Sequence, residues 1–358
     1  MYADRLDLLR SPCCHVGLTL HAPMAKFGEV WGGRLVCARC GADYAIRRGM
    51  PHLYVEDARW LPKAREAAGW VAFHKQRGIY DVVAGAIDLR IPYYPEEPWL
   101  GVARSFDIGL RLLGPLGPAT VLDLGAGRGW AAKLFAARGG QVVALDVADD
   151  DNVGLGRALA LMADAGVAFD RLIGDGENLP LADGRFDLVF CAAALHHFSD
   201  LPELFRQIAR VLRPGGRLLA IREPSLSIAA DEAATLDQVA GEELAAGINE
   251  NNPSLVDYLD GLSGAGLRLL RATTPDLVDL SDDALAKHGR CVGALRPSPA
   301  AALAHQRMYW GTRWRAARLG RLGVARRALL PFAGRTQLEL AHLLWAGGEM
   351  ILLAQKPG

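Results

Sequence analysis

The sequence predicts an α/β protein with a doubly wound (Rossmann-like), mostly parallel sheet of seven strands. Three features support this. Between residues 118 and 224, short apolar runs alternate with amphipathic stretches. A glycine-rich turn at 125–129 follows the first run, and Asp146 ends the second. Strands that alternate with helices need crossover connections, and these produce parallel sheets covered on both faces.

Seven apolar runs have the length of buried strands. They span residues 119–124, 141–145, 168–174, 186–192, 216–221, 267–272 and 349–355. Between the fourth and fifth runs, apolar residues from Leu201 to Leu212 follow helical spacing. Ser199-Asp200 caps this stretch, and Pro214-Gly215-Gly216 ends it. A second capped helix is predicted just before the sixth strand, where Leu255, Tyr258, Leu259 and Leu262 fall on one face.

Four regions are predicted from composition. They are a small Cys- and Gly-containing module (1–56), a helical linker or lid segment (57–117), the central core (118–225), and a C-terminal region that completes the sheet (226–358). A helical insert of about 276–348 separates the last two strands. Inserts in open α/β folds often cover substrates, so we expect a lid. Tyr93, Tyr94 and Trp99 are the expected substrate-binding aromatic residues.

The composition is that of an ordinary globular protein. The 358 residues carry a formal net charge of zero, and 51% are hydrophobic. A zero net charge removes the usual electrostatic argument for a nucleic-acid binder. The N-terminal residues lack the apolar core of a signal peptide, and the most apolar stretch, 338–354, is interrupted by charged residues and glycines. We expect a cytoplasmic protein without a membrane segment; the sequence does not indicate an oligomeric state.

The glycine-rich turn carries the strongest functional signal. Asp123-Leu-Gly125-Ala-Gly127-Arg-Gly129 lies where the first strand meets the first helix. Glycine allows close approach of a ligand and positive φ, and the helix N-terminus offers free N–H groups. Asp146 follows Gly125 by 21 residues, a spacing suited to binding ribose hydroxyls. The dinucleotide pattern G-x-G-x-x-G fails, because its last position is the bulky Trp130.

Five segments in order resemble the signatures of class I S-adenosylmethionine-dependent methyltransferases. They are residues 121–129, 143–146, 174–183, 186–190 with 195–198, and 211–216. The resemblance implies S-adenosylmethionine as cofactor and in-line transfer of its methyl group. It also implies a cofactor role for Asp123, Gly125, Ala126, Gly127, Gly129, Asp146, Val147, Asp175, Gly176, Glu177, Ala192 and Ala193.

The implied roles follow the position of each residue in the motif. The Gly125–Gly129 backbone holds the methionine part, with Asp123 near its amino group, and Asp146 holds the ribose. Asp175, with the backbone of the two residues that follow it, contacts the adenine. Ala192 and Ala193 line the methionyl side near the sulfonium.

Three residues are the expected catalytic groups. His196 and His197 follow the fourth strand, close to the transferred methyl group, and one of them could act as a general base near neutral pH. The alternative is a structural pair that caps the next helix. Glu223 follows the fifth strand on the expected acceptor side, unless it is a solvated loop residue.

The N-terminal module contains a C-x-x-C knuckle, Cys37-Ala-Arg-Cys40, which can place two thiolates on one zinc ion. The expected partner knuckle is Ser11-Pro-Cys13-Cys14, with Ser11 in the first cysteine position. The segment resembles the small zinc ribbon that accompanies some rRNA and tRNA methyltransferases. We expect a structural zinc ion on Cys13, Cys14, Cys37 and Cys40, with His15 or His21 as alternatives to Cys13. The competing hypothesis is a ribbon that keeps its fold without metal.

The sequence favours a methyltransferase of secondary metabolism that acts on a small natural-product or sugar-like acceptor. One alternative is an rRNA or tRNA base methyltransferase, suggested by the ribbon and by an Arg- and Trp-rich stretch at 305–327. Another is an inactive scaffold that binds partners through the ribbon. The residues do not identify the acceptor, nor whether oxygen, nitrogen or carbon is methylated.

Overall fold

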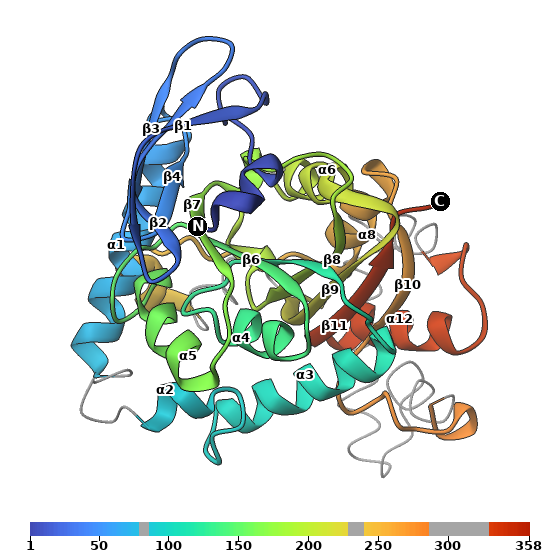
Figure 1. Ribbon diagram of the computed structural model, residues 1–358. Coiled ribbons are helices and arrows are strands. Elements are labelled where there is room, and N and C mark those ends of the chain that lie inside the picture. Colours follow the sequence, from blue (N-terminus) through green and yellow to red (C-terminus); the bar gives the residue numbers. More distant parts are fainter. Residues whose placement is uncertain (79–85, 228–239, 286–328) are drawn as a thin grey trace.

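The computed structural model describes residues 1–78, 86–227, 240–285 and 329–358. The described strands form one mixed sheet of eleven, in the order β1-β2-β3-β4-β7-β6-β5-β8-β9-β11-β10 (Figure 1). The strands are β1 (Leu18–Lys26), β2 (Glu29–Cys37), β3 (Asp43–Arg47), β4 (Met50–Leu53), β5 (Thr120–Leu124), β6 (Gln141–Asp146), β7 (Asp170–Gly174), β8 (Phe186–Ala192), β9 (Leu212–Ser225), β10 (Arg268–Thr273) and β11 (Gly348–Gln355). The α-helices are α1 (Trp60–Arg77), α2 (Ala86–Arg90), α3 (Trp99–Leu113), α4 (Trp130–Ala137), α5 (Ala158–Ala165), α6 (Leu201–Val211), α8 (Leu255–Gly264) and α12 (Gly334–Ala346).

Both faces of the central sheet are covered. In β6, Val142 and Ala144 belong to one hydrophobic cluster, which also contains residues of α3, α4 and α5. Val143 and Leu145, which alternate with them, belong to a second cluster with residues of α6, α8 and α12. Successive side chains of a strand point to opposite faces, so the apolar runs of the sequence bury both sides. The predicted doubly wound α/β architecture is confirmed.

All seven predicted strands are present, but the sheet continues beyond them. β4 pairs in parallel with β7, with His52 opposite Ile173 and Leu53 opposite Gly174. β1, β2 and β3 extend the sheet further through antiparallel pairs. The predicted count of seven strands therefore omitted four that belong to the N-terminal segment. β4 is only four residues long and contains Pro51, which hides it in the sequence.

The predicted helix caps agree with the structure. Asp200 caps α6, since its side chain accepts a hydrogen bond from the Glu203 N–H at 2.9 Å. Ser254 and Asp257 form a capping box at the start of α8. β11 lies between β9 and β10 and runs antiparallel to both, which closes the sheet with a hairpin-like return.

The described part of the predicted lid insert does not line the cavity described below. Its helix α12 packs against β10 and α8 on one face of the sheet. Residues 286–328, which include the Arg- and Trp-rich stretch 305–327, lie outside the described residues. In the part of the chain that is described, no helix has the length and apolar composition needed to cross a bilayer.

Candidate functional site

A cavity of about 790 Å³ opens at the carboxyl ends of the central parallel strands. One side is formed by the glycine turn after β5, by the end of β6 and by the residues that follow β8. The opposite side comes from α1, from the start of α3 and from residues 247–250. This volume lies within the usual range for sites that bind small ligands. The edge where parallel strands end is also where ligands bind in open α/β sheets.

The glycine turn has the backbone that the motif predicts. Gly125, Gly127 and Gly129 have positive φ values of 70°, 52° and 81°. A Cβ atom on Gly125 would lie 2.6 Å from the Cβ of Ala194, and one on Gly129 would lie 3.1 Å from the Phe169 ring. Gly125, Ala126 and Gly127 line the cavity, whereas Gly129 caps α4 behind it. Glycine is therefore required here by both conformation and space.

Asp146 joins the end of β6 to the glycine turn. Its Oδ2 accepts a hydrogen bond from the Gly127 N–H at 2.7 Å, and its Oδ1 accepts one from the Ala148 N–H at 2.9 Å. Asp146 and Val147 both line the cavity. Burial raises the pKa of Asp146, against the effect of these backbone donors. Each carboxylate oxygen keeps a further lone pair, so the group can still accept from ligand hydroxyls.

Asp123 lies beneath the turn rather than at its surface. The residue is 2% exposed and is not among those that line the cavity. Its Oδ2 accepts a hydrogen bond from the Ala132 N–H in the first turn of α4, at 2.9 Å. Burial raises the pKa of Asp123 to about 7. The Asp123 side chain thus links the end of β5 to the first turn of α4 and stabilises the connection between them.

A lysine that the sequence did not indicate completes the end of the cavity near β7. Lys63 of α1 places its Nζ 2.5 Å from Glu177 and 3.3 Å from Asp175. Asp175 also accepts a hydrogen bond from the Glu177 N–H at 2.8 Å. Burial lowers the pKa of Lys63, but its two carboxylate partners outweigh burial and raise it. Lys63 and Gly176 line the cavity, while the Asp175 and Glu177 side chains lie behind them.

Helix α1 forms much of the opposite wall. Lys63, Glu66, Trp70 and His74 all line the cavity. They are separated by three, four and four residues, which places them on one face of the helix. The signal was present in the sequence as a polar stripe on a predicted helix, but such a stripe is usually a solvated surface.

Near the wall formed by α1, two histidines and two glutamates meet. His196 Nε2 lies 3.6 Å from Glu250 Oε2, and His197 Nδ1 lies 3.6 Å from Glu250 Oε1. Glu66 Oε1 lies 3.7 Å from His197 Nδ1. All four residues line the cavity. The structure therefore brings the two predicted histidines together with Glu66 and Glu250, which the sequence did not indicate.

Glu223 lies behind this cluster and does not line the cavity. The residue is 0% exposed. Its Oε1 accepts hydrogen bonds from the N–H groups of Ala194 at 2.9 Å and Leu195 at 3.1 Å. Its Oε2 lies 3.0 Å from His196 Nδ1. Glu223 therefore fixes the loop after β8 and the orientation of the His196 ring.

The four residues of this cluster have shifted pKa values, because their charges are buried close together. Burial, and next the charge of Asp146, raises the pKa of Glu66 to about 8. Burial also raises the pKa of Glu250. Burial, and next the charge of His196, lowers the pKa of His197 to about 3. Burial lowers the pKa of His196, but the hydrogen bond to Glu223 and the charges of Glu223, Glu250 and Glu66 together outweigh burial, so the pKa is raised.

Of the three predicted substrate-binding aromatic residues, one lines the cavity and two do not. Trp99, at the start of α3, lines the cavity. Tyr93 is 47% exposed, and its hydroxyl donates to Asp107 of α3 at 2.8 Å. Neither Tyr93 nor Tyr94 lines the cavity. Trp70, from α1, is the further aromatic residue of the wall, and its ring lies edge-to-face with His197.

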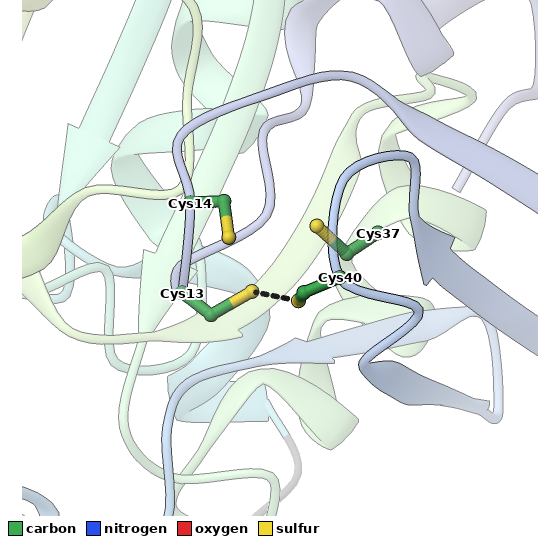
Figure 2. A group of neighbouring side chains, drawn as sticks. All are labelled: Cys13, Cys14, Cys37 and Cys40. Atoms are coloured by element: carbon green, nitrogen blue, oxygen red, sulfur yellow. Dashed lines mark hydrogen bonds between the residues drawn. The ribbon is translucent and has the colours of Figure 1, made fainter.

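The four predicted cysteines converge in the N-terminal segment. Figure 2 shows Cys13 and Cys14 on one loop facing Cys37 and Cys40 on another, and their Sγ atoms all lie within 4.8 Å of one another. Cys13 Sγ lies 3.4 Å from Cys40 Sγ.

The two alternative ligands, His15 and His21, are engaged elsewhere. The ring of His15 bonds to Asn178, and that of His21 bonds to Thr19. The geometry thus favours Cys13 as the fourth member of the group.

The central part of this chain is similar to known methyltransferases. Residues 122–220 match the family model described as a methyltransferase domain. The malonyl-[acyl-carrier protein] O-methyltransferase of Methylococcus capsulatus is 35% identical over 145 residues, which cover 35% of this chain and 51% of the relative. The ubiquinone/menaquinone biosynthesis C-methyltransferase UbiE of Acidiphilium cryptum is 33% identical over 160 residues, covering 44% of this chain and 62% of the relative.

Among solved structures, the YcgJ protein from Bacillus subtilis is 19% identical, with a TM-score of 0.44. The match covers 72% of this chain and 99% of the YcgJ chain. The chain spans about half the length of the malonyl-[acyl-carrier protein] methyltransferase it matches. The matched segment contains the glycine turn, Asp146 and the histidine pair. Residues 122–220 of this chain are therefore similar to the methyltransferase domain family.

Proposed function

We propose that this protein is an S-adenosylmethionine-dependent methyltransferase that acts on a small molecule, of natural-product or sugar-like type. One observation carries the proposal. A single cavity of about 790 Å³ joins the glycine turn and Asp146 to the histidine–glutamate cluster. A cofactor bound at the first group would present its reactive end to an acceptor bound at the second.

In this proposal the cofactor lies along the carboxyl ends of β5, β6 and β7. The turn from Gly125 to Gly127 holds the methionine part, and Asp146 accepts from the ribose hydroxyls. The adenine lies beside Gly174 and Gly176, at the end closed by Lys63. Ala192 and Ala193 flank the sulfonium. All the residues named in this paragraph line the cavity, whereas Asp175 and Glu177 do not.

The acceptor occupies the remaining space, between α1 and the residues after β8. Methyl transfer is an in-line displacement at carbon, so the enzyme must chiefly align the acceptor atom with the methyl–sulfur bond. His196 and His197 contact the acceptor side, and Glu223 positions His196 through the hydrogen bond to Nδ1. The curated relatives are named for an acyl-carrier-bound malonyl group and for a quinone, which supports a small acceptor group in general terms.

The N-terminal segment holds a structural zinc ion in this proposal. Sulfur atoms that share one zinc ion lie roughly 3.8 Å apart, given Zn–S bonds of about 2.3 Å in a tetrahedron. The observed separations, 3.4 Å for one pair and within 4.8 Å for all, suit that arrangement. Four thiolates leave no open position for water or substrate, so the ion would stabilise the ribbon and take no part in catalysis.

Calorimetry with S-adenosylhomocysteine tests the cofactor site. We predict that Asp146→Asn weakens binding at least tenfold, because the ribose hydroxyls lose a charged acceptor. The matched control is Asp164→Asn, an exposed carboxylate on α5, which should leave affinity unchanged. Equal affinity in both variants would refute the site. If the wild-type protein does not bind S-adenosylhomocysteine at millimolar concentration, the inactive scaffold is favoured instead. If it binds, but an activity assay shows methylation of RNA and of no small molecule, the tRNA or rRNA alternative is favoured.

Zinc analysis tests the ribbon. We predict one zinc ion per chain by elemental analysis, and its loss in Cys40→Ser together with a lower melting temperature, because one of four ligands is removed. Cys191→Ser is the control, since Cys191 is a buried residue of β8 outside the group. A zinc content that stays at one in Cys40→Ser, or that is zero in the wild-type protein, would rule out the four-cysteine site.

A further inference from the structure

We infer that Asn178 is a positioning residue through which a zinc ion on the four cysteines strengthens binding of the cofactor. Asn178 ends the short helical turn Gly176–Asn178, which follows Asp175 after the end of β7. Gly176 lines the cavity, whereas Asn178 does not. The inference rests on the proposed function, because it requires both the cofactor site and the zinc site.

The side chain of Asn178 holds the loop that carries Cys13 and Cys14 (Figure 2). Its Nδ2 donates to the Pro12 carbonyl at 3.1 Å, and its Oδ1 lies 2.8 Å from His15 Nε2. A carbonyl only accepts, so the amide nitrogen faces Pro12 and the amide oxygen accepts from the His15 ring. Pro12 and His15 stand directly before and after the two cysteines. One amide group therefore fixes both ends of this pair.

The side-chain contacts between this loop and the second pair of cysteines are weak. Cys13 Sγ lies 3.4 Å from Cys40 Sγ, and the Cys37 thiol donates to Ser11 Oγ at 3.3 Å. Thiols are poor donors and poor acceptors of hydrogen bonds. A zinc ion shared by the four sulfur atoms would add bonds of about 2.3 Å. Metal binding would therefore order the loop, and that order reaches Asn178 through its two hydrogen bonds.

On its other side, Asn178 belongs to the turn that would contact the adenine. Its backbone N–H donates to the Asp175 carbonyl at 3.1 Å, and the Glu177 N–H donates to the Asp175 carboxylate at 2.8 Å. Gly176 packs so closely against the Phe198 ring that no room is left for a Cβ atom. Phe198 also lines the cavity. A shift of Asn178 would therefore move the cavity wall beside the adenine.

These contacts link two binding equilibria. A loop and turn that zinc has already ordered lose less conformational freedom when the cofactor binds, so the cofactor binds more tightly. Such coupling is reciprocal, so the cofactor must strengthen zinc binding by the same factor. Couplings between two sites typically amount to about 5–150-fold in affinity. Because the turn has three residues, we expect an effect at the lower end of that range.

Calorimetric titration of the full chain with S-adenosylhomocysteine, before and after zinc removal, tests the coupling. Zinc is removed by dialysis against a chelator with a reductant present, so that the cysteines stay thiols. We predict that the wild-type protein binds S-adenosylhomocysteine about fivefold more weakly without zinc. Hydrogen exchange should also show less protection of the Glu177 and Asn178 N–H groups after zinc removal, because these groups close the turn.

Asn178→Ala removes both side-chain hydrogen bonds and changes no residue of the cavity wall. We predict that this variant keeps one zinc ion by elemental analysis and binds S-adenosylhomocysteine about fivefold more weakly than the wild-type protein. Removing its zinc should weaken binding no further. Asp7→Asn is the control, since it removes an exposed pair between the N-terminal segment and Arg185. It should keep the affinity and the zinc response of the wild-type protein.

Circular dichroism checks that each protein is folded. If Asn178→Ala is not, Asn178→Asp provides the same comparison, because it keeps the acceptor for His15 and removes the donor to Pro12. If the zinc-free wild-type protein unfolds, the zinc-loaded variant decides, and wild-type affinity in that variant would overturn the inference.

The outcomes separate the coupling from the proposed function. Equal affinity with and without zinc in the wild-type protein, or an undiminished zinc effect in Asn178→Ala, would refute the coupling and leave both sites standing. No binding of S-adenosylhomocysteine in either state would refute the cofactor site and the coupling with it. Binding of S-adenosylhomocysteine by a protein that takes up no zinc would refute the zinc site and the coupling, and leave the cofactor site standing.

Discussion

Two buried carboxylates beside the cavity, Asp123 and Glu223, have different surroundings and different consequences. Glu223 is satisfied by backbone N–H groups and by the His196 ring, so burial of its charge is compensated. The described partner of the Asp123 carboxylate is one backbone N–H, that of Ala132. A buried carboxylate with few donors holds its proton to higher pH, which accounts for the raised pKa of Asp123.

The raised pKa of Asp123 predicts how stability depends on pH. Its folded pKa of about 7 lies above the unfolded value, so its contribution is fully present below the unfolded pKa and is lost as pH rises through 7. We expect Asp123→Asn to reduce the fall in unfolding free energy between pH 5 and pH 7 by about 2 kcal/mol. Urea titrations at pH 5, 6 and 7 measure this. Asp164→Asn, which changes an exposed carboxylate, should keep the wild-type slope; an unchanged slope in Asp123→Asn would contradict the assignment.

Among individual residues, those fixed by local chain geometry could be predicted from the sequence. Gly125, Gly127 and Asp146 lie at the ends of two predicted strands, and the strand pairing brings them together. Lys63, Glu66 and Glu250 could not be assigned to the site from the sequence, because α1 and the segment around Glu250 are distant in the chain from the strand ends that form the cavity. Glu223 was predicted at the site, but its buried position behind His196 depends on a hydrogen-bond network that sequence spacing does not reveal.

At the scale of secondary-structure elements, α12 is attached to the sheet by a buried carboxylate. Glu339 is 0% exposed and pairs with Arg271 of β10 and with Arg335 of its own helix. The Thr273 hydroxyl also donates to it, at 3.0 Å. Removing one member of a buried pair leaves the other charge uncompensated, so this contact should contribute to stability far more than a surface pair.

We therefore expect Glu339→Ala to lower the free energy of unfolding by about 3 kcal/mol. The comparison is Asp276→Ala, which removes an exposed pair between Asp276 and Arg104 and should cost less than about 1 kcal/mol. Urea denaturation monitored by circular dichroism measures both. Similar losses in the two variants would show that the Glu339 network does not hold α12 to the sheet.

Elements with strong periodicity were predicted, and short or discontinuous ones were not. α6 shows helical spacing, a cap at Asp200 and a proline in its first turn, so its bounds agree within one residue. β4 has four residues and pairs with β7 through long-range contacts, so no local pattern marked it. The lid predicted for the insert stays a prediction, because the described helix α12 packs on the sheet and residues 286–328 lie outside the described residues.

On the scale of the whole molecule, the N-terminal strands and the central sheet share a buried ion pair. Arg171 of β7 is 0% exposed and lies 3.0 Å from Glu29 of β2, which is also buried. The same guanidinium donates to the Arg48 carbonyl at 2.9 Å. Together with the β4–β7 pairing, this contact joins the N-terminal strands to the central sheet.

This arrangement predicts that the folding of the N-terminal strands depends on their contact with the central sheet. Arg171→Met should lower the unfolding free energy by about 3 kcal/mol, since buried Glu29 would keep only the Met1 amino group as a charged partner. Hydrogen exchange should show the loss of protection in β1, β2 and β3. Arg185→Met is the control, because it removes the exposed pair between Arg185 and Asp7. If both variants lose equal stability, or β1–β3 keep their protection in Arg171→Met, the ribbon is held by other contacts.

A crystal structure grown with S-adenosylhomocysteine tests the central claim most directly. We predict one ligand in the cavity, with its ribose hydroxyls on Asp146, its adenine beside Gly174 and Gly176, and its methionine part against the turn at Gly125 and Gly127. Its sulfur would then face the His196–His197–Glu250 group. A ligand bound elsewhere, or an empty cavity at saturating ligand, would contradict the proposal that this cavity is a methyl-transfer site.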